Sequence, residues 1–487
     1  MRLTALLLLI LLAPSAVAAR PNVLLLICDD LNCDLGCYGD PVVQSPSIDK
    51  LANRGTRFTQ AHCQFPLCGP SRASMMTGLY PDQTRIRQNA IRIRQTMPNV
   101  IAMPQAFRAA DYLATRIGKI YHYGVPRHIG TAGHDDPYSW NQTHNPRGID
   151  VADEPKIFTL RPRHFGGTLS WLASGGTDEE QTDGIAATIA CEFLSRRRPT
   201  DAPFFLAVGM YRPHTPYVAP KSDFDRYPTD SITVPTVPAG YLDTLPPPAR
   251  QTLTAKKHQR NLPDHLGRRA IQAYHASITF VDRQIGRILN TLDQTDLADD
   301  TIVVFTSDHG YHMGQHGHWQ KQTLFQDATH VPLIIAGPGI SRGTATFAEL
   351  VDLYPTLCDL AGVPGPRTLA GRSLAALVRD DPPNPRIDAL TQHANGYTLR
   401  TDHHRFTAWG NRGDAGVELY DVTKDPAEMR NLADAPEHQS TLGKLRTRLF
   451  DRVDHAAKKP AGLKQLEASE MKGIPTPSQI KAILGKR

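Results

Sequence analysis

Four short apolar runs constrain the fold of this chain more than any other feature of its sequence. Each run stops abruptly at polar residues, as strands buried on both faces do, and the runs cover residues 23–28, 204–210, 301–306 and 331–336. Between them, apolar side chains recur at three- and four-residue steps, which predicts helices over 268–292 and 350–361. Strands that alternate with helices predict an α/β fold with a mostly parallel sheet between layers of helices.

The first eighteen residues have the pattern of a secretory signal peptide. Arg2 precedes an apolar run at 6–12, and Ala16 and Ala18 form an A-x-A cleavage site. The run is well short of the ~20 residues that a membrane-spanning helix needs, and no later segment is long enough. We therefore expect an exported protein without a membrane anchor, which would be periplasmic or secreted, or lysosomal in a eukaryote.

A proline-rich stretch at 376–387 predicts a domain boundary. After it come short strand-like pieces at 405–409 and 417–420 and a helical stretch around 438–455, which together predict a smaller α+β domain. We therefore expect three parts, namely the signal peptide at 1–18, a main domain at 19–380 and a C-terminal subdomain at 381–487.

Charge and cysteine content exclude other classes of protein. A net charge of +6 over 487 residues, without a long Lys/Arg run, gives no support to nucleic-acid binding. Seven cysteines are too few for a disulfide-framed scaffold, and their odd number leaves one thiol to be reactive or modified. Cys28, Cys33 and Cys37 lack the partner motif of a zinc site, so we expect buried thiols or one disulfide.

Acidic residues and histidines follow three of the predicted strands. Asp29 and Asp30 follow the first, His214 follows the second, and Asp308 and His309 follow the third. Because open α/β sheets bind ligands at the carboxyl ends of their strands, these residues are expected to share one site. Close carboxylates repel one another unless a cation lies between them, so a divalent ion such as Ca²⁺ or Mg²⁺ is expected there.

The segment Cys68-Gly-Pro-Ser-Arg72 resembles the C-x-P-S-R signature of the sulfatase family. Further pieces of the family pattern follow in order over nearly the whole mature chain, among them Lys119, His122, His214, Asp308-His309-Gly310, Lys321 and Leu419-Tyr420-Asp421. The spacing Lys119-x-x-His122 and the histidine after Asp308 resemble the branch that contains iduronate-2-sulfatase. The resemblance implies an alkaline-phosphatase-like core, with residues 19–380 as the catalytic domain.

The resemblance also implies a nucleophile. In sulfatases a maturation enzyme oxidises the signature cysteine to formylglycine, so Cys68 would act as a geminal diol. One hydroxyl would attack sulfur and expel the sugar alcohol. The second would let the enzyme–sulfate collapse to the aldehyde and sulfate, an exit that serine and cysteine lack.

The remaining roles follow from the same family pattern. One Ca²⁺ ion would bind Asp29, Asp30, the modified Cys68, Asp308 and His309. Arg72, Lys119 and Lys321 would balance charge on the sulfate and the nucleophile. His122 would contact the diol. His214, with Lys321, would protonate the leaving oxygen.

The expected substrate is a sulfated oligosaccharide or polysaccharide, with a 2-O-sulfated uronic acid favoured by the iduronate-like spacing. A phosphate or phosphonate monoester hydrolase on the same fold is one alternative, although related phosphatases generally use Ser or Thr nucleophiles and two zinc ions. A non-catalytic binder of sulfated glycans is another, if Cys68 stays unmodified. His312, His316 and His318 could form a second metal site, but we expect them to line the substrate pocket.

Overall fold

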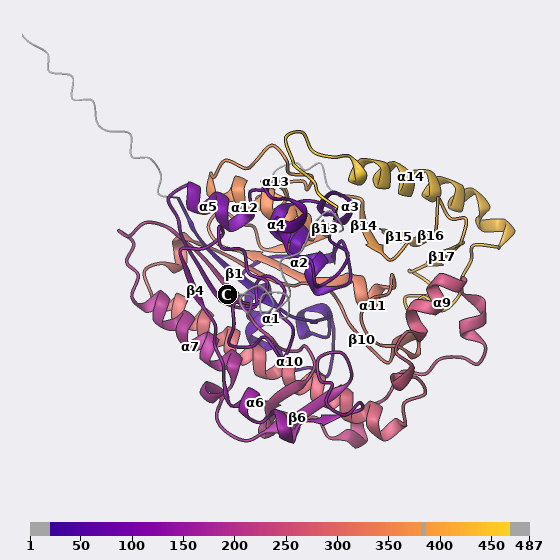
Figure 1. Cartoon of the computed structure of the whole chain (residues 1–487), viewed down its shortest axis with the longest axis horizontal. Helices are drawn as coiled ribbons and strands as arrows, with labels where there is room; N and C mark the ends of the chain where they lie inside the picture. Colours follow the sequence, from indigo (N-terminus) through magenta and orange to yellow (C-terminus); the bar gives the residue numbers. More distant parts are fainter. Residues whose placement is uncertain (1–19, 381–385, 468–487) are drawn as a thin grey trace, which may run out of the picture.

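The computed structural model describes residues 20–380 and 386–467, and an eight-stranded sheet lies at its centre (Figure 1). From edge to edge the strands are β13 (Gly343–Glu349), β2 (Gly55–His62), β12 (His330–Ala336), β9 (Thr301–Ser307), β1 (Asn22–Cys28), β7 (Phe204–Gly209), β3 (Leu113–Gly118) and β4 (Gln142–His144). β12 runs antiparallel to both of its neighbours, and the other pairs in this sheet are parallel. The mostly parallel sheet predicted from the apolar runs is confirmed.

The sheet is buried on both faces, which explains why its central strands are continuous apolar runs. Along β1, Leu24 and Leu26 pack in one core with α1 (Pro46–Ala52), α7 (Thr182–Ser195) and α10 (Asp264–Asp293). Val23 and Leu25 point the other way and pack with α2 (Cys68–Thr77), α5 (Met103–Ala109) and α12 (Leu353–Ala361). Alternate side chains of one strand thus serve two cores.

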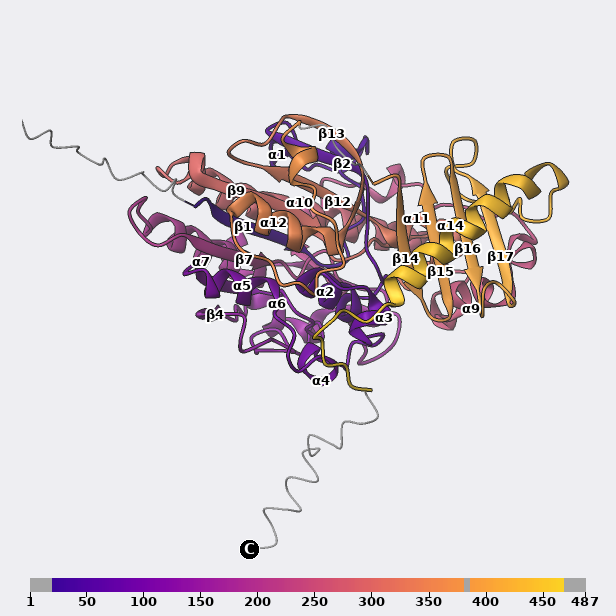
Figure 2. The ribbon, with the colours of Figure 1, turned by 90° about the horizontal axis from the view of Figure 1, so that it is seen from above.

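A second, antiparallel sheet forms the C-terminal part of the molecule, as predicted. Its strands are β14 (Asp388–His393), β15 (Gly396–Thr401), β16 (His404–Trp409) and β17 (Gly416–Asp421). Helix α14 (Gln439–Ala457) lies across these strands in Figure 2, and its Leu445 and Leu449 pack with Leu399 and Phe406 of the sheet. One face of this sheet therefore has its own apolar core.

Shorter elements connect these layers. The strands are β5 (Phe158–Thr159), β6 (Ser170–Ser174) and β8 (Tyr217–Pro220), which form a small sheet, and the hairpin of β10 (His312–Met313) and β11 (Trp319–Gln320). The helices are α3 (Pro81–Thr84), α4 (Ile93–Thr96), α6 (Ile149–Ala152), α8 (Lys221–Phe224), α9 (Pro247–Thr254), α11 (Gln326–Thr329) and α13 (Ala375–Val378).

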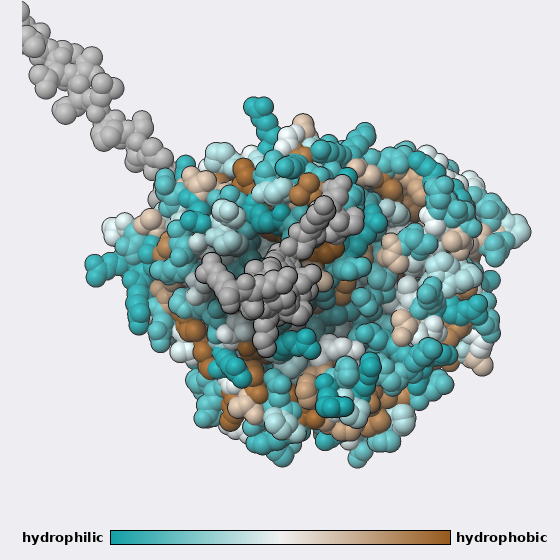
Figure 3. Space-filling model, viewed as in Figure 1, coloured by the Kyte–Doolittle hydropathy of each residue, from teal (hydrophilic) through white to brown (hydrophobic). Residues whose placement is uncertain are grey.

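Two predictions fall outside the described residues. The signal peptide lies within 1–19, and the boundary between 380 and 381 lies at the edge of the gap 381–385. None of the helices that the structure describes is both long and apolar enough to cross a bilayer. The face seen in Figure 3 is mostly hydrophilic, with small, scattered hydrophobic patches.

Candidate active site

The carboxyl ends of three neighbouring strands bring the predicted site residues together. β1 lies between β7 and β9 and is parallel to both, so all three strands end at the same edge of the sheet. Asp29 and Asp30 follow β1, Asp308 and His309 follow β9, and His214 lies beyond the end of β7. The topology of the sheet alone therefore explains why residues far apart in sequence meet.

Four buried side chains bring donor atoms to within 4.8 Å of one another: Asp29, Asp30, Cys68 and His309. Asp308 borders this group, with its Oδ1 3.7 Å from Nε2 of His309. Oδ2 of Asp30 is buried and has no hydrogen-bond partner among the described residues, which is costly for a carboxylate oxygen unless another ligand satisfies it. Carboxylates that converge around an open oxygen fit a hard divalent cation such as Ca²⁺.

Asp30 has a left-handed backbone conformation, with a φ of 65°. Consecutive side chains of a regular strand point to opposite faces, so Asp29 and Asp30 could not otherwise face one centre. The hydroxyl of Tyr274 on α10 donates to the carbonyl of Asp30 at 2.8 Å and accepts from the N–H of Asn32 at 2.9 Å. Helix α10 thus holds the unusual turn that aims both carboxylates at the site.

Cys68 is the first residue of α2 and is fully buried. Its Sγ lies 3.2 Å from Nζ of Lys321 and 3.3 Å from Nε2 of His309. Burial, and then the negative charge of Asp29, raise the pKa of the Cys68 thiol well above its usual range. The unmodified residue is therefore a protonated thiol, which is a poor nucleophile.

Arg72 lies one turn further along α2 and positions two of the carboxylates. Its Nε donates to Oδ2 of Asp308 at 2.8 Å, and its Nη2 donates to Oδ1 of Asp29 at 3.2 Å. Its Nη1 donates to the main-chain carbonyls of Lys119 and Ile120 at 2.6 and 3.0 Å. All three nitrogens of this fully buried guanidinium are thus used within the protein.

Two lysines each neutralise one carboxylate. Nζ of Lys119 donates to Asp29, and Nζ of Lys321 donates to Asp30. Burial would raise the pKa of Asp29, but the charges of Lys119 and Arg72 hold it well below its usual range. Burial would lower the pKa of Lys321, but the charge of Asp30 raises it, so Lys321 keeps its proton beside position 68.

His214 lies between the carboxylates and a cavity. Its Nδ1 is 2.5 Å from the carbonyl of Thr215, so Nδ1 carries the proton. Its Nε2 faces Oδ2 of Asp30 at 3.7 Å, which is too long for a hydrogen bond. Burial, and then Lys321, lower the pKa of His214 well below its usual range, so the ring is neutral.

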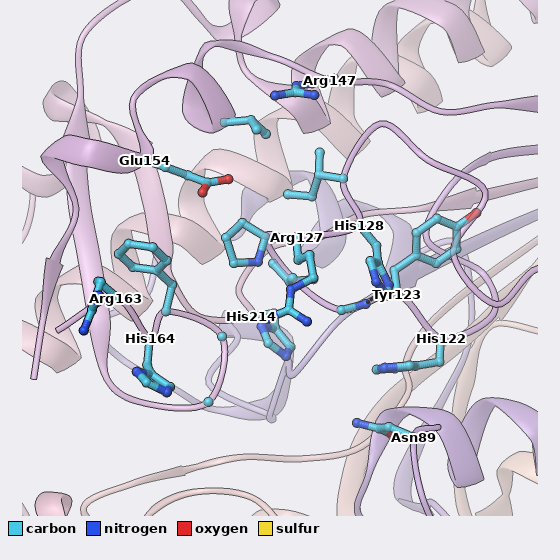
Figure 4. Close-up of a pocket in the computed structure, with 18 residues that line it drawn as sticks. Asn89, His122, Tyr123, Arg127, His128, Arg147, Glu154, Arg163, His164 and His214 are labelled. Atoms are coloured by element: carbon cyan, nitrogen blue, oxygen red, sulfur yellow. Dashed lines mark hydrogen bonds between the residues drawn. The ribbon is translucent and has the colours of Figure 1, made fainter. Parts of the chain in front are cut away.

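The cavity has a volume of about 650 Å³, and His122 and His214 are part of its wall (Figure 4). Burial, and then Lys119, lower the pKa of His122 to about 2. No hydrogen bond joins His122 to Cys68 in the part of the chain that the structure describes. Basic side chains predominate around the cavity, with Glu154 as the one acidic residue against Arg127, His128, Arg147, Arg163 and His164.

These five basic residues were not predicted from the sequence. They come from loops whose residues show no periodicity, and nothing at their positions matches a motif. The one available signal was the density of arginine and histidine between residues 122 and 164. An excess of positive charge in a cavity favours an anionic ligand.

His312, His316 and His318 hold the loop between β9 and Lys321 in place. His312 hydrogen-bonds a threonine hydroxyl, and His316 the hydroxyl of Tyr241. His318 faces two main-chain carbonyls, one of them that of Lys321 at 3.1 Å. Among the described residues they do not form a second group of metal donors, so they fix the segment that carries Lys321.

All seven cysteines are free in the structure, and all lie within its described residues. Of the two expectations for Cys28, Cys33 and Cys37, the disulfide is therefore absent. Cys28 is a buried thiol, while Cys33 and Cys37 are only half-buried. Sγ of Cys33 lies 3.8 Å from Nε2 of His330, but these cysteines form no zinc cluster within the described chain.

The fold and the strand-end site define a hydrolase of the alkaline-phosphatase-like α/β class. A model of the Sulfatase family matches residues 21–363, and a model described as N-sulphoglucosamine sulphohydrolase, C-terminal, matches residues 314–455. Iduronate 2-sulfatase of Homo sapiens is 32% identical, over 84% of this chain and 90% of that protein. The chain belongs to the sulfatase family and is a sulfatase, which confirms the resemblance seen in the sequence.

Solved structures agree with this assignment. A structure described as a 2-O GAG sulfatase superposes with a TM-score of 0.69 at 25% identity, over 90% of this chain and 92% of that one. The phosphonate monoester hydrolase of Agrobacterium radiobacter superposes with a TM-score of 0.72 at 22% identity, over 90% and 96% of the two chains. At that level of identity the second likeness concerns the fold alone.

Proposed function

We propose that this protein removes sulfate from a sulfated acidic sugar, with Ca²⁺ as cofactor and a formylglycine made from Cys68 by a maturation enzyme. The observation that carries the proposal is the position of Cys68. It lies among the metal donors and 3.2 Å from the Lys321 ammonium, and His214 links this cluster to the basic cavity.

The chemistry needs positive charge around the sulfate. A Ca²⁺ ion held by Asp29, Asp30, Asp308 and His309 would stabilise negative charge on the sulfate and the nucleophile. The hydrated aldehyde at position 68 would supply the attacking oxygen and a route to release sulfate. Lys321, within reach of position 68, adds a fixed positive charge there.

The sugar oxygen must gain a proton as its bond to sulfur breaks. Lys321 already holds a proton next to position 68, whereas neutral His214 carries its proton on Nδ1 and faces the site with Nε2. His214 can act as the acid only after it gains a second proton. Lys321 lies 3.2 Å from Sγ of Cys68 and His214 lines the adjoining cavity, so either one can serve a leaving group bound there.

A comparison of leaving groups separates these two donors. A sugar alkoxide needs protonation, whereas a nitrophenolate scarcely does. If His214 is the acid, His214→Ala should lose about 10²–10⁴-fold in kcat/KM on a sulfated sugar and much less on 4-nitrophenyl sulfate. Equal losses on both substrates would assign His214 to sulfate binding and the proton to Lys321.

The basic cavity supports an acidic sugar as the substrate. Arg127, Arg147 and Arg163 line it together with the single acid Glu154. The relatives named iduronate 2-sulfatase point in the same direction. A uronic acid 2-sulfate, as in heparan or dermatan sulfate, fits both observations.

Mass spectrometry combined with kinetics tests the proposal. A peptide spanning residue 68 should contain formylglycine, which is lighter than cysteine. A uronate 2-sulfate disaccharide should be hydrolysed with a higher kcat/KM than the matching phosphate, which carries nearly one more negative charge. Unmodified Cys68 without turnover would indicate a glycan binder, and preference for the phosphate with zinc stimulation would indicate a phosphatase.

We further propose that the chain is exported after removal of residues 1–18, and that residues 19–380 form the catalytic domain and 381–487 the C-terminal subdomain. The charged start, apolar run and A-x-A site support the export. Sequencing of the mature N-terminus should begin near Ala19, and an uncleaved, cell-retained protein would contradict it.

A further inference from the structure

A second, smaller cavity shares no lining residue with the first. Its volume is about 230 Å³, and Lys321 is part of its wall. Four separate segments line it: α9 with the residues up to Lys256, the stretch from His318 to Gln322, the β14–β15 turn from His393 to Asn395, and Trp409 at the end of β16. The main domain and the C-terminal sheet thus both contribute to it.

Direct contacts show how the two cavities adjoin. Nζ of Lys256, in the wall of the second cavity, donates to the carbonyl of Gly167 at 3.3 Å, and Gly167 lines the first. Lys321, which lines the second cavity, forms an ion pair with Asp30. Nε2 of His214, which lines the first cavity, lies 3.7 Å from Oδ2 of the same carboxylate. Asp30 is therefore approached by one residue from each cavity, and Lys321 also contacts Cys68.

The second cavity is positively charged. Lys256 and Lys321 line it, and no aspartate or glutamate does. Lys321 is neutralised by Asp30, but Lys256 is half-buried and has no carboxylate partner among the described residues. Burial, and then Lys321 and Arg161, lower the pKa of Lys256, as expected for an ammonium without a counter-ion.

The other polar lining suits a sugar. Gln251, Gln322 and Asn395 offer amide groups that can donate to and accept from hydroxyls. Trp409 adds an aromatic surface. The cavity is much smaller than the first, so it can take one ring or one charged substituent.

We propose that this cavity is a second subsite, in which Lys256 binds the carboxylate or sulfate of the sugar next to the one that is desulfated. This inference rests on the proposed function, because it assumes that the first cavity holds the scissile sugar. The substrate is then a polyanionic chain that runs across the reacting centre. The β14–β15 turn gives the C-terminal subdomain a direct part in substrate choice.

The decisive experiment compares Lys256→Ala with Lys257→Ala. Lys257 is the next residue, carries the same charge, is exposed and lines neither cavity. On a disaccharide whose second sugar is charged, Lys256→Ala should lose about tenfold to 100-fold in kcat/KM, the usual range for a hydrogen bond to a charged group. Lys257→Ala should match the wild type, and Lys256→Arg should restore most of the loss.

Further substrates locate the effect and identify the anion. On 4-nitrophenyl sulfate, which has no second sugar, Lys256→Ala should be as active as the wild type. Three disaccharides, with a carboxylate, a sulfate or neither on the second sugar, show which anion Lys256 binds. An equal loss on all of these substrates, or no loss on any, would overturn the subsite.

A binding measurement keeps this inference separate from the proposed function. Calorimetry can follow the charged disaccharide on Cys68→Ala protein, with and without Lys256→Ala. Tenfold or greater weakening by Lys256→Ala would support the subsite even if the wild type hydrolysed none of these sulfates. Unchanged binding together with normal turnover would reject the subsite and leave the sulfatase activity intact.

Discussion

The molecule contains two clusters in which three buried carboxylates meet three cations. One lies at the strand ends and contains Asp29, Asp30, Asp308, Arg72, Lys119 and Lys321. The other lies between β13, β14 and helix α14 and contains Glu349, Asp352, Asp388, Arg386, Arg448 and Arg452. Their charges are equal, but their hydrogen bonding differs.

In the second cluster every carboxylate oxygen has a partner within the protein. Glu349 accepts from Tyr80, from the N–H of Leu390 and from Arg452, and forms an ion pair with Arg386. All three cations are arginines, whose planar forks suit carboxylates. Such a cluster has no place for a ligand, and its function is to join the two sheets.

The strand-end cluster is left incomplete by comparison. Oδ2 of Asp30 has no hydrogen-bond partner in the described chain, and two of the three cations are lysines. A lysine ammonium is a compact point charge on a flexible stem, so it can move between a carboxylate and a bound anion. The difference between a binding cluster and a structural one therefore lies in a carboxylate oxygen left without a partner, since the net charge of the two clusters is the same.

Asp30→Asn tests the strand-end cluster and should have the largest effect of the variants proposed. It removes a proposed metal ligand and the counter-ion of Lys321, and loss of one preorganised electrostatic group typically lowers a rate by about 10²–10³-fold. We expect the two losses together to lower kcat/KM about 10⁴-fold. The rise in Tm that Ca²⁺ gives the chelator-treated wild type should also disappear.

Asp34→Asn is the matched control for this variant. Asp34 lies in the same loop and hydrogen-bonds Asn32, but it is not one of the clustered donors. It should keep normal activity and the Ca²⁺-dependent rise in Tm. If Asp30→Asn also kept that rise, the metal site would have to be placed elsewhere.

Arg386→Ala tests the second cluster, which we call closed because every one of its carboxylate oxygens has a partner. Removal of Arg386 leaves Asp352 with an uncompensated buried charge, which typically costs about 3–5 kcal/mol, while Glu349 keeps Arg452 as its partner. The free energy of unfolding from urea titration should fall by that amount, while kcat of the folded enzyme stays unchanged. A loss of kcat with unchanged stability would show that this cluster acts on catalysis.

The sequence predicted the central part of the site better than its surroundings. Strands β1, β7 and β9 are continuous apolar runs because they are buried on both faces, so their ends, and Asp29, Asp30 and Asp308 with them, could be placed. Strands β2 and β3 were missed, because Arg57 and Arg116 interrupt their apolar pattern. Tertiary hydrogen bonds of Arg116 to Asp135 and Asn145 compensate that buried charge, and no local pattern reveals them.

Roles that depend on where a side chain points could not be predicted from the sequence either. Arg72 follows Cys68 by four residues, and the sulfatase resemblance assigned it to charge balance on the sulfate and the nucleophile, but the structure shows its nitrogens on Asp29, Asp308 and main-chain carbonyls. The assignment of Arg72 to sulfate binding stays a prediction, and its visible role is to position carboxylates. The left-handed turn at Asp30 likewise depends on Tyr274, from a distant helix.

Glu418 shows a third way to keep a carboxylate in the interior. It accepts hydrogen bonds from Trp409 and Tyr420 and has no ion pair among the described residues. Burial raises the pKa of Glu418 from 4.5 to about 7, although these hydrogen bonds lower it. A bound proton thus neutralises the Glu418 carboxylate. In the two clusters, arginines, lysines and the proposed metal ion neutralise the carboxylates instead.

Glu418→Gln should therefore change the pH dependence of stability. Because the folded protein binds this proton more tightly than the unfolded chain, the wild type loses stability as pH rises from about 4.5 to about 7. At about 1.4 kcal/mol per pKa unit, the stability of Glu418→Gln relative to the wild type should rise by up to about 3 kcal/mol across that range. Urea titrations from pH 4.5 to 8 measure it, and a difference independent of pH would contradict it.

Asp454→Asn should have the smallest effect, although Asp454 forms an ion pair with good geometry. Its two oxygens lie 3.0 and 2.9 Å from Nη2 of Arg412, but both side chains are more than half exposed. Exposed pairs of this kind contribute about 0.2–1 kcal/mol at most, because water and salt screen them. We expect a change in unfolding free energy within about 0.5 kcal/mol, and still less in high salt.

The contrast with Arg452 gives this last measurement its value. Arg452 and Asp454 are two residues apart on α14, and at 3.6 residues per turn they point to nearly opposite sides of the helix. Arg452 contacts Glu349 and Asp388 in the closed cluster, whereas Asp454 faces water. If Asp454→Asn cost as much as Arg386→Ala, burial could not be what separates the clusters from ordinary surface pairs, and the comparison between them would fail.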